Sequence, residues 1–242
     1  MTRVSDKVSQ QVKELPEDTS FGYGQLAIPK QEYLTAAKAL ERLQKKGVIK
    51  KLAKGIFYKP KKTVFGEKKP DEQQLLKPYL YQNGKRTAYI TGDYLYNQLG
   101  LTTQVPAVMQ IASRNRRIFV NNGAVKATPV KSYVDVTDAN YQMLGFLDAI
   151  KDLKQIPDVD IENALAIFKS RLSVLTPAQR QMVIDYALAY PPRVRALLGA
   201  ILMDLNVKKG IDKLSSSLNP LTTFELGIND SLLPTASDWH IR

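Results

Sequence analysis

The stretch Thr35–Lys62, TAAKALERLQKKGVIKKLAKGIFYKPKK, governs how the N-terminal part of this chain folds. Its apolar residues recur with a period of about 3.6, which predicts a helix over Gln31–Lys46 with an inner face of Ala37, Leu40 and Leu43. Gly47 follows two lysines, at a position where a left-handed glycine commonly ends a helix. The stretch therefore begins with one amphipathic helix and a defined stop.

A short hairpin is predicted directly after this helix. Val48–Leu52 and Ile56–Lys59 read as antiparallel strands joined around residues 53–55, where Gly55 has the backbone freedom that a tight turn needs. A helix followed by a basic hairpin is typical of a winged helix-turn-helix domain. We therefore predict that residues 1–66 form such a domain, and Lys61–Pro70 has the composition of a linker.

Positive charge is concentrated in this N-terminal part. Residues 1–70 carry 16 Lys or Arg and 7 Asp or Glu, whereas the remaining 172 residues carry 19 and 16. Ten of the cations lie between Lys38 and Lys62, against the single acid Glu41. Such a local excess favours a polyanionic partner, nucleic acid above all. The alternative is a lysine-rich face that is only solvated.

Residues 71–242 are predicted to form a mixed α/β domain with a helical C-terminal part, so the whole chain falls in the α+β or mixed class. Short alternating runs predict a sheet over residues 87–136, with Asn121-Asn122-Gly123 as a hairpin turn. Apolar periodicity and helix start signals predict helices over residues 138–218. The tail, residues 219–242, is expected to be extended or irregular.

The composition removes several classes of protein and site. The chain has no cysteine, which excludes disulfides, thiolate metal sites and cysteine nucleophiles. No run approaches the roughly 18 apolar residues of a membrane span. The first residues also lack the apolar core of a signal peptide. A cytoplasmic protein without a membrane partner is therefore expected.

Patterns for catalysis or metal binding are weak. The only histidine is His240, near the end of the sequence. Asp158, Asp160 and Glu162 have a spacing that suits a divalent cation. A helix capped by Asp160, with Glu162 in its first turn, explains the same residues better. We therefore expect no enzymatic activity, no cofactor and no metal site.

The residues expected to contact DNA lie on the predicted helix and hairpin. A recognition helix brings its N-terminal side chains to base edges in the major groove, and the lysines of a hairpin contact phosphates. The predicted set is Lys30, Gln31, Thr35, Lys38, Arg42, Lys45, Lys46, Lys50, Lys51 and Lys54. A secondary basic patch is expected at Arg114, Arg116 and Arg117, with a solvated surface as the alternative.

Two motifs resemble those of a known family. Residues 39–58 match the pattern A-L-x-R-L-x-K-x-G-x-I-x-[KR]-x-x-[KR]-G-[IV]-[FY]-Y, and residues 90–106 match I-T-G, six residues, then L-G-L-T-x-Q-V-P. In this order, the similar stretches resemble the antitoxins of abortive-infection type IV toxin–antitoxin systems, the AbiE antitoxin group. The resemblance covers about a third of the chain.

The resemblance implies a winged N-terminal domain and a larger α/β domain after it. It implies a repressor that binds double-stranded DNA at inverted repeats in the promoter of its own operon, which suits a dimer on DNA. It further implies an antitoxin that opposes a nucleotidyltransferase-like toxin without a need for stable binding between the two. The alternative is a protein-interaction module that binds a partner toxin directly and has no specific DNA recognition.

Overall fold

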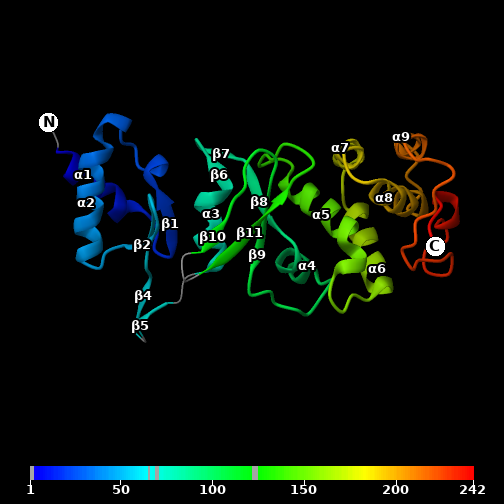
Figure 1. The fold of residues 1–242 in the computed structure, drawn as a ribbon, viewed down its shortest axis with the longest axis horizontal. Helices are drawn as coiled ribbons and strands as arrows, with labels where there is room; N and C mark the ends of the chain where they lie inside the picture. Colours follow the sequence, from blue (N-terminus) through cyan, green and yellow to red (C-terminus); the bar gives the residue numbers. More distant parts are fainter. Residues whose placement is uncertain (1–2, 65, 69–70, 122–124) are drawn as a thin grey trace. The chain divides into compact units, whose positions relative to one another are not determined.

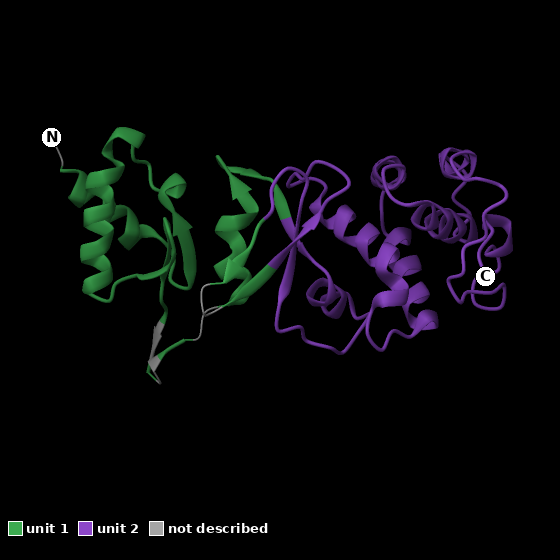
Figure 2. Ribbon diagram, viewed as in Figure 1, with its two compact units in different colours: residues 1–88, 118–127 green, residues 89–117, 128–242 purple. Residues whose placement is uncertain are grey.

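The computed structural model describes residues 3–64, 66–68, 71–121 and 125–242 and has an α+β fold (Figure 1). The chain divides into two compact units (Figure 2). Unit 1 comprises residues 1–88 and 118–127, and unit 2 comprises residues 89–117 and 128–242. Unit 1 thus reaches beyond the linker-like stretch at residues 61–70. Among the described residues, no helix combines the length and apolar character needed to cross a bilayer.

Unit 1 opens with two helices and a three-stranded sheet. Helix α1 (Val4–Glu14) leads to strand β1 (Thr19–Gly22), and two 3-10 turns, η1 (Tyr23–Gln25) and η2 (Lys30–Glu32), precede helix α2 (Tyr33–Lys45). Strands β2 (Lys50–Ala53) and β3 (Ile56–Lys59) follow. The sheet order is β1-β3-β2, and both pairings are antiparallel. The hairpin predicted from the sequence is therefore present.

Helix α2 packs against α1 through its apolar face. The centre of this face lies at Ala36, Ala39 and Leu40, all buried, whereas Ala37 and Leu43 are only half-buried. The predicted inner face of Ala37, Leu40 and Leu43 was therefore wrong in part, by a small rotation about the helix axis. Phe21 and Phe57, with ring centroids 5.8 Å apart, extend the same core under the sheet.

Two glycines lie where the sequence predicted them to act, one at the end of α2 and one in the hairpin turn. Gly47 has a φ of +69°, and its N–H donates to the Gln44 carbonyl at 2.9 Å while the Val48 N–H donates to Leu43 at 3.0 Å. This is the left-handed stop of α2. Gly55, with a φ of +76°, takes the hairpin turn between β2 and β3. A side chain at either position would strain the backbone.

The remainder of unit 1 holds short elements: β4 (Lys62–Thr63), β5 (Gly66–Glu67), helix α3 (Glu72–Leu80), β6 (Tyr81–Gln82) and β7 (Lys85–Arg86). Strands β4 and β5 pair with each other, as do β6 and β7. Helix α3 is capped by Asp71, whose carboxylate accepts from the Gln73 N–H at 2.9 Å. It packs on β1, where the Ser20 hydroxyl donates to the Gln74 carbonyl.

A four-stranded sheet has the order β10-β11-β9-β8. Its strands are β8 (Ala88–Thr91), β9 (Met109–Ser113), β10 (Val120–Asn121) and β11 (Lys126–Lys131), and helix α4 (Asp93–Leu99) follows β8. The sheet ends at Lys131, short of the predicted limit at residue 136. At that end, the Ser132 side chain donates to the Val134 carbonyl, which is a local turn contact rather than a ladder bond. Of the predicted turn Asn121-Asn122-Gly123, the last two residues lie outside the described ones.

The C-terminal part of unit 2 is helical, as predicted. Helix α5 (Tyr141–Asp152) ends in the 3-10 turn η3 (Leu153–Gln155), and α6 (Ile161–Ser173), α7 (Pro177–Ala187), α8 (Pro192–Asp204) and α9 (Ile211–Ser216) follow. Helix α8 is buried along most of its length and packs on α5, α6, α7 and α9. It is the centre of the larger core.

The tail, residues 219–242, is largely irregular, but it is packed rather than free. A 3-10 turn, η4 (Ser237–Trp239), brings the Trp239 ring onto α8, where its Nε1–H donates to the Met203 sulfur at 3.4 Å. Phe224 and Ile241 form a bridge close to the end of the chain. The ring lies over Gly199, where a Cβ would stand 2.2 Å from a Trp239 ring carbon. The glycine therefore provides the space for the tryptophan.

Substituting Gly199→Ala is expected to displace Trp239 and to lower the free energy of unfolding by about 1–3 kcal/mol, since the helix backbone cannot yield to the added methyl. Trp239 is the only tryptophan, so urea unfolding followed by its fluorescence reports both effects. Gly24→Ala is the control, because nothing lies within 4 Å of a Cβ there. A wild-type emission maximum and midpoint for Gly199→Ala would contradict this packing.

Candidate nucleic-acid interface

The outward face of α2 is made by residues that follow one another at intervals of about one helical turn. Leu34, Lys38, Glu41 and Lys45 follow the spacing of a single helical stripe, and all four are exposed. This stripe lies on the side of the helix opposite Leu40, which is buried against α1. The amphipathic sequence thus directs one face to the core and presents a mostly charged face to solvent.

All ten residues predicted to contact DNA are exposed and belong to unit 1. Consecutive elements carry them: the turn η2, helix α2 with its C-cap, strand β2 and the hairpin turn. In that order they are Lys30 and Gln31, then Thr35, Lys38, Arg42, Lys45 and Lys46, then Lys50 and Lys51, and Lys54. The surface formed by these ten residues is called the basic surface below.

Two lysines of the basic surface have acidic partners. The Lys45 ammonium lies 2.9 Å from the Glu41 carboxylate, and the hydrogen bond from Lys45 lowers the pKa of Glu41. The Lys50 ammonium lies 2.8 Å from the Glu67 carboxylate. Among the described residues, no ion pair joins Lys38, Lys51 or Lys54 to an acid. These three charges are therefore available to a polyanion without loss of an internal partner.

The hairpin is held by contacts on its other side. The Tyr58 hydroxyl, from β3, donates to Asp18 at 2.6 Å, and the Lys68 ammonium lies 2.5 Å from the same carboxylate. The bond from Lys68, then that from Tyr58, lowers the pKa of Asp18. Lys59 donates to the carbonyls of Lys13, in the last turn of α1, and of Leu15, the residue after the helix. These contacts fix β3 of the hairpin relative to the end of α1 and the segment after it.

The predicted secondary patch is less uniform. Arg114 is exposed, but its guanidinium donates to the Tyr133 carbonyl at 2.6 Å and so fixes the end of β9. Arg116 is half-buried, and burial lowers its pKa. Arg117 is exposed. The three residues lie in unit 2 and do not present three equivalent free cations.

The acidic cluster has the capping role that the sequence favoured. Asp160 accepts from the N–H groups of Glu162 and Asn163 at 3.0 and 3.3 Å, at the start of α6. Asp158 accepts from the Gln104 side chain at 2.8 Å. Within the described part of the chain, no group of three or more His, Cys, Asp or Glu side chains is arranged to hold a metal ion. His240 is half-buried and follows η4 in the left-handed conformation.

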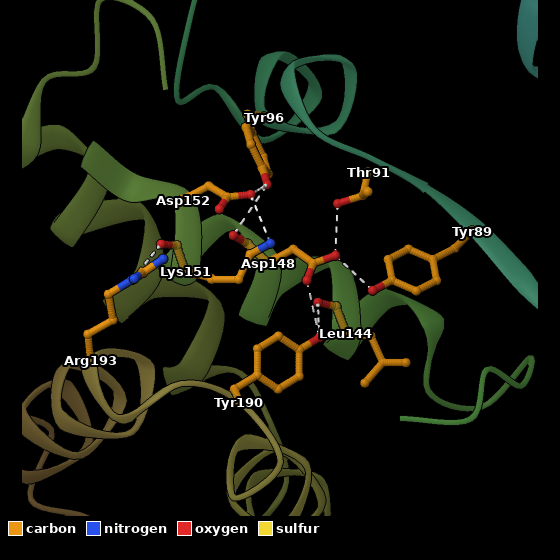
Figure 3. Close-up of polar contacts among 9 residues, drawn as sticks. All are labelled: Tyr89, Thr91, Tyr96, Leu144, Asp148, Lys151, Asp152, Tyr190 and Arg193. Atoms are coloured by element: carbon orange, nitrogen blue, oxygen red, sulfur yellow. Dashed lines mark hydrogen bonds and ion pairs between the residues drawn. The ribbon is translucent and has the colours of Figure 1, made fainter. Parts of the chain in front are cut away.

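A buried carboxyl group in unit 2 was not anticipated from the sequence. Asp148, on α5, accepts hydrogen bonds from the Tyr89 hydroxyl at 2.7 Å and from the Thr91 hydroxyl at 2.8 Å (Figure 3). The Tyr190 hydroxyl lies 3.3 Å from the other carboxyl oxygen and 3.1 Å from the Leu144 carbonyl. The three hydroxyls come from β8 and from the segment before α8, so this network ties the sheet to the helices.

A second carboxyl group extends the network toward solvent. Asp152 accepts from the Tyr96 hydroxyl at 2.7 Å and lies 3.2 Å from the Lys151 ammonium. Arg193 donates to the Lys151 carbonyl at 3.2 Å (Figure 3). Burial raises the pKa of Tyr96, and it does the same for Tyr89 and Tyr190. These tyrosines are therefore held neutral as donors, as a structural network requires.

Burial also raises the pKa of Asp148, opposed by the charge of Lys151 and by the bonds from Tyr89 and Thr91. The Tyr190 hydroxyl has one proton and two nearby acceptors, so it either shares that proton between them or accepts a second hydrogen bond from a protonated Asp148. A protonated Asp148 can donate to the Tyr190 oxygen while Tyr190 donates to Leu144. The arrangement satisfies every polar group in the cluster, which suits a structural role.

Three comparisons relate the chain to known proteins. A family profile described as "Family of unknown function (DUF6088)" matches residues 26–170. Among solved structures, a match is the crystal structure of the RV2827C protein from Mycobacterium tuberculosis, with a TM-score of 0.41 and 12% identity over 91% of this chain and 84% of that one. No curated protein matches. A structural likeness this low does not establish a shared fold.

Proposed function

Because the chain belongs to the family of unknown function DUF6088, we propose a function from the site itself: unit 1 binds double-stranded DNA through the basic surface. The observation that carries the proposal is that all ten predicted contact residues are exposed on consecutive elements: the turn η2, helix α2 with its C-cap, and the hairpin after it. Protein-contact surfaces are usually depleted in lysine at their centre. Lysine-rich surfaces suit the phosphate backbone.

The geometry supports a winged helix-turn-helix mode of binding. Helix α2 has the exposed, cationic outer face that a recognition helix needs to enter a major groove. The hairpin of β2 and β3 follows α2 in the chain and carries the exposed Lys51 and Lys54, which would contact phosphates or an adjacent minor groove. Lysines then supply most of the affinity, while Gln31 and Arg42 supply choice of sequence.

The biological role proposed for this binding is repression. The resemblance to AbiE-type antitoxins extends it to autoregulation of a toxin–antitoxin operon through inverted repeats, and to a type IV antitoxin that opposes a nucleotidyltransferase-like toxin. This role needs no catalysis by the chain. It also fits a cytoplasmic protein that binds DNA as a dimer. Direct binding of a toxin is the rival function.

A selection from random duplexes of about 24 base pairs, followed by a mobility shift with the enriched sequence and a pull-down of the neighbouring gene product, tests the two functions against each other. Enrichment of a defined sequence supports DNA recognition. Uniform recovery of the pool together with capture of the gene product would favour the interaction module and would contradict the proposal.

Arg42→Ala is expected to weaken binding to the enriched duplex by about 1–3 kcal/mol while leaving binding to unrelated duplexes nearly unchanged, since a bidentate contact from Arg discriminates between bases. Fluorescence anisotropy with both duplexes measures this. Arg171→Ala is a matched control, because Arg171 is exposed on α6 of unit 2. An equal loss on both duplexes would reassign Arg42 to phosphate contact.

A further inference from the structure

Leu34 is an exception on α2. Its side chain is 83% exposed, whereas every other apolar residue of the helix is buried or half-buried. It lies on the outward stripe, four residues before Lys38 and seven before Glu41. A large apolar side chain thus occupies the same outward stripe as the charged side chains of Lys38, Glu41 and Lys45.

The position of Leu34 within the helix is informative. It is the second residue of α2, so it lies in the N-terminal turn, the part of a recognition helix that meets base edges. The exposed Gln31 precedes it by three residues, at the spacing that places two side chains on one side of a helical turn. The leucine and the amide are therefore neighbours at the leading end of the basic surface.

Base chemistry restricts what a leucine can contact in a major groove. Its floor is lined by hydrogen-bond donors and acceptors, and the apolar feature that it offers is the C5-methyl group of thymine. The same A·T pair offers adenine N6 and N7, which suit the bidentate amide of Gln or Asn. A leucine beside a glutamine therefore matches the two edges of A·T pairs and finds no apolar partner on G·C pairs.

We propose that Leu34 contacts a thymine methyl group and that, together with Gln31, it selects A·T pairs where the N-terminus of α2 enters the major groove. The inference rests on the proposed DNA binding and adds the class of base that this helix end reads. It assigns the exposed leucine a partner on DNA, in keeping with the cations that share its face.

The test uses the full chain and the duplex enriched from the random pool. Each thymine is replaced in turn by deoxyuridine, which removes only the methyl group. Wild type is expected to lose about fourfold in affinity at one or two positions. This is the change in affinity expected when one carbon-sized apolar group is no longer buried in the complex. Leu34→Ala is expected to bind the unmodified duplex less tightly and to lose its sensitivity to those same substitutions.

The controls separate this inference from the proposed function. Leu221→Ala removes another exposed leucine, 91% exposed and located in unit 2, and should keep the wild-type response to deoxyuridine. If wild type ignores every replacement, or if Leu34→Ala keeps the wild-type pattern, the inference is overturned while DNA binding stands. If the chain enriches no duplex at all, both fail. A DNA-free dimer that dissociates in Leu34→Ala, measured by sedimentation, would assign the leucine to a contact between copies and overturn the inference.

Discussion

The triple variant Lys38→Ala, Lys51→Ala and Lys54→Ala is expected to bind every duplex more weakly and with less dependence on salt. Each phosphate contact contributes a slope of about −0.9 to the logarithm of affinity against the logarithm of salt concentration, so three lost contacts reduce its magnitude by about 2.7. These lysines are exposed, and no ion pair within the described residues is lost with them. The folded state should therefore be retained, as circular dichroism would check.

A control of equal charge distinguishes local contact from net charge. Arg171, Lys208 and Lys209 are exposed cations of unit 2, and replacing all three by alanine lowers the net charge by the same amount. This variant should keep nearly the wild-type slope, measured by anisotropy between about 50 and 200 mM salt. Equal reductions in the two triple variants would mean that affinity follows overall charge, and the basic surface would lose its assigned role.

The largest effect on stability is expected from Asp148→Ala. The substitution removes the carboxyl group that accepts hydrogen bonds from the Tyr89 and Thr91 hydroxyls. It therefore leaves these buried hydroxyls without that acceptor. Each unsatisfied group costs about 1–3 kcal/mol, so the free energy of unfolding should fall by about 3–5 kcal/mol. Urea unfolding followed by the fluorescence of Trp239 measures the loss. A change below about 1 kcal/mol would show that the network contributes little.

Asp148→Asn is the matched comparison, since it keeps the shape and one acceptor oxygen. Its amide N–H can donate to Tyr190 as a protonated carboxyl does, so the loss should be much smaller than for alanine. Burial raises the pKa of Asp148 above its ordinary value of 3.8 in the folded chain. The folded state then holds the proton more tightly than the unfolded state, and this stabilisation is lost as pH rises through the folded pKa.

The raised pKa of Asp148 predicts how the free energy of unfolding changes with pH. The stability of wild type relative to Asp148→Asn should be greatest near pH 4 and should decrease toward neutral pH, because only the wild-type carboxyl group titrates. Unfolding in urea at several pH values measures the difference. A relative stability that instead rises with pH would mean that the folded chain favours the ionised carboxylate, and the hydrogen-bond assignment at Tyr190 would be wrong.

The parts of the fold that the sequence predicts are those set by neighbouring residues. Gly47 and Gly55 mark a helix stop and a tight turn because their conformations are local, and the structure has both at a positive φ. Asp160 is likewise recognisable as a cap from the residues just after it. The predicted inner face of α2 was less accurate, because the buried face of the helix depends on its contacts with α1 rather than on residue spacing alone.

The Asp148 network could not be predicted for the opposite reason. Its partners Tyr89, Thr91 and Tyr190 are separated from it by 59, 57 and 42 positions, and no local pattern links them. Asp148 lies in an otherwise apolar stretch of α5, and that is the signal that was present. A lone acid within a buried helical run calls for hydroxyl or cationic partners elsewhere in the chain.

Leu34 shows a further limit of periodicity. In the sequence it reads as one more apolar residue of a helix, whereas the structure places it on the charged face. Only the rotation of α2 about its own axis, set by its packing on the core, decides whether Leu34 is buried or exposed. The same rotation also determines which side of the helix a DNA groove would meet.

The most direct test of DNA binding is the affinity of the full wild-type chain for its enriched duplex, measured by anisotropy across salt concentrations. Six phosphate contacts would lower the affinity about 10³-fold between 50 and 200 mM salt, on a linear double-logarithmic plot. A steep negative slope with saturable binding is the predicted result. A flat dependence, or no binding at 50 mM salt, would contradict the account.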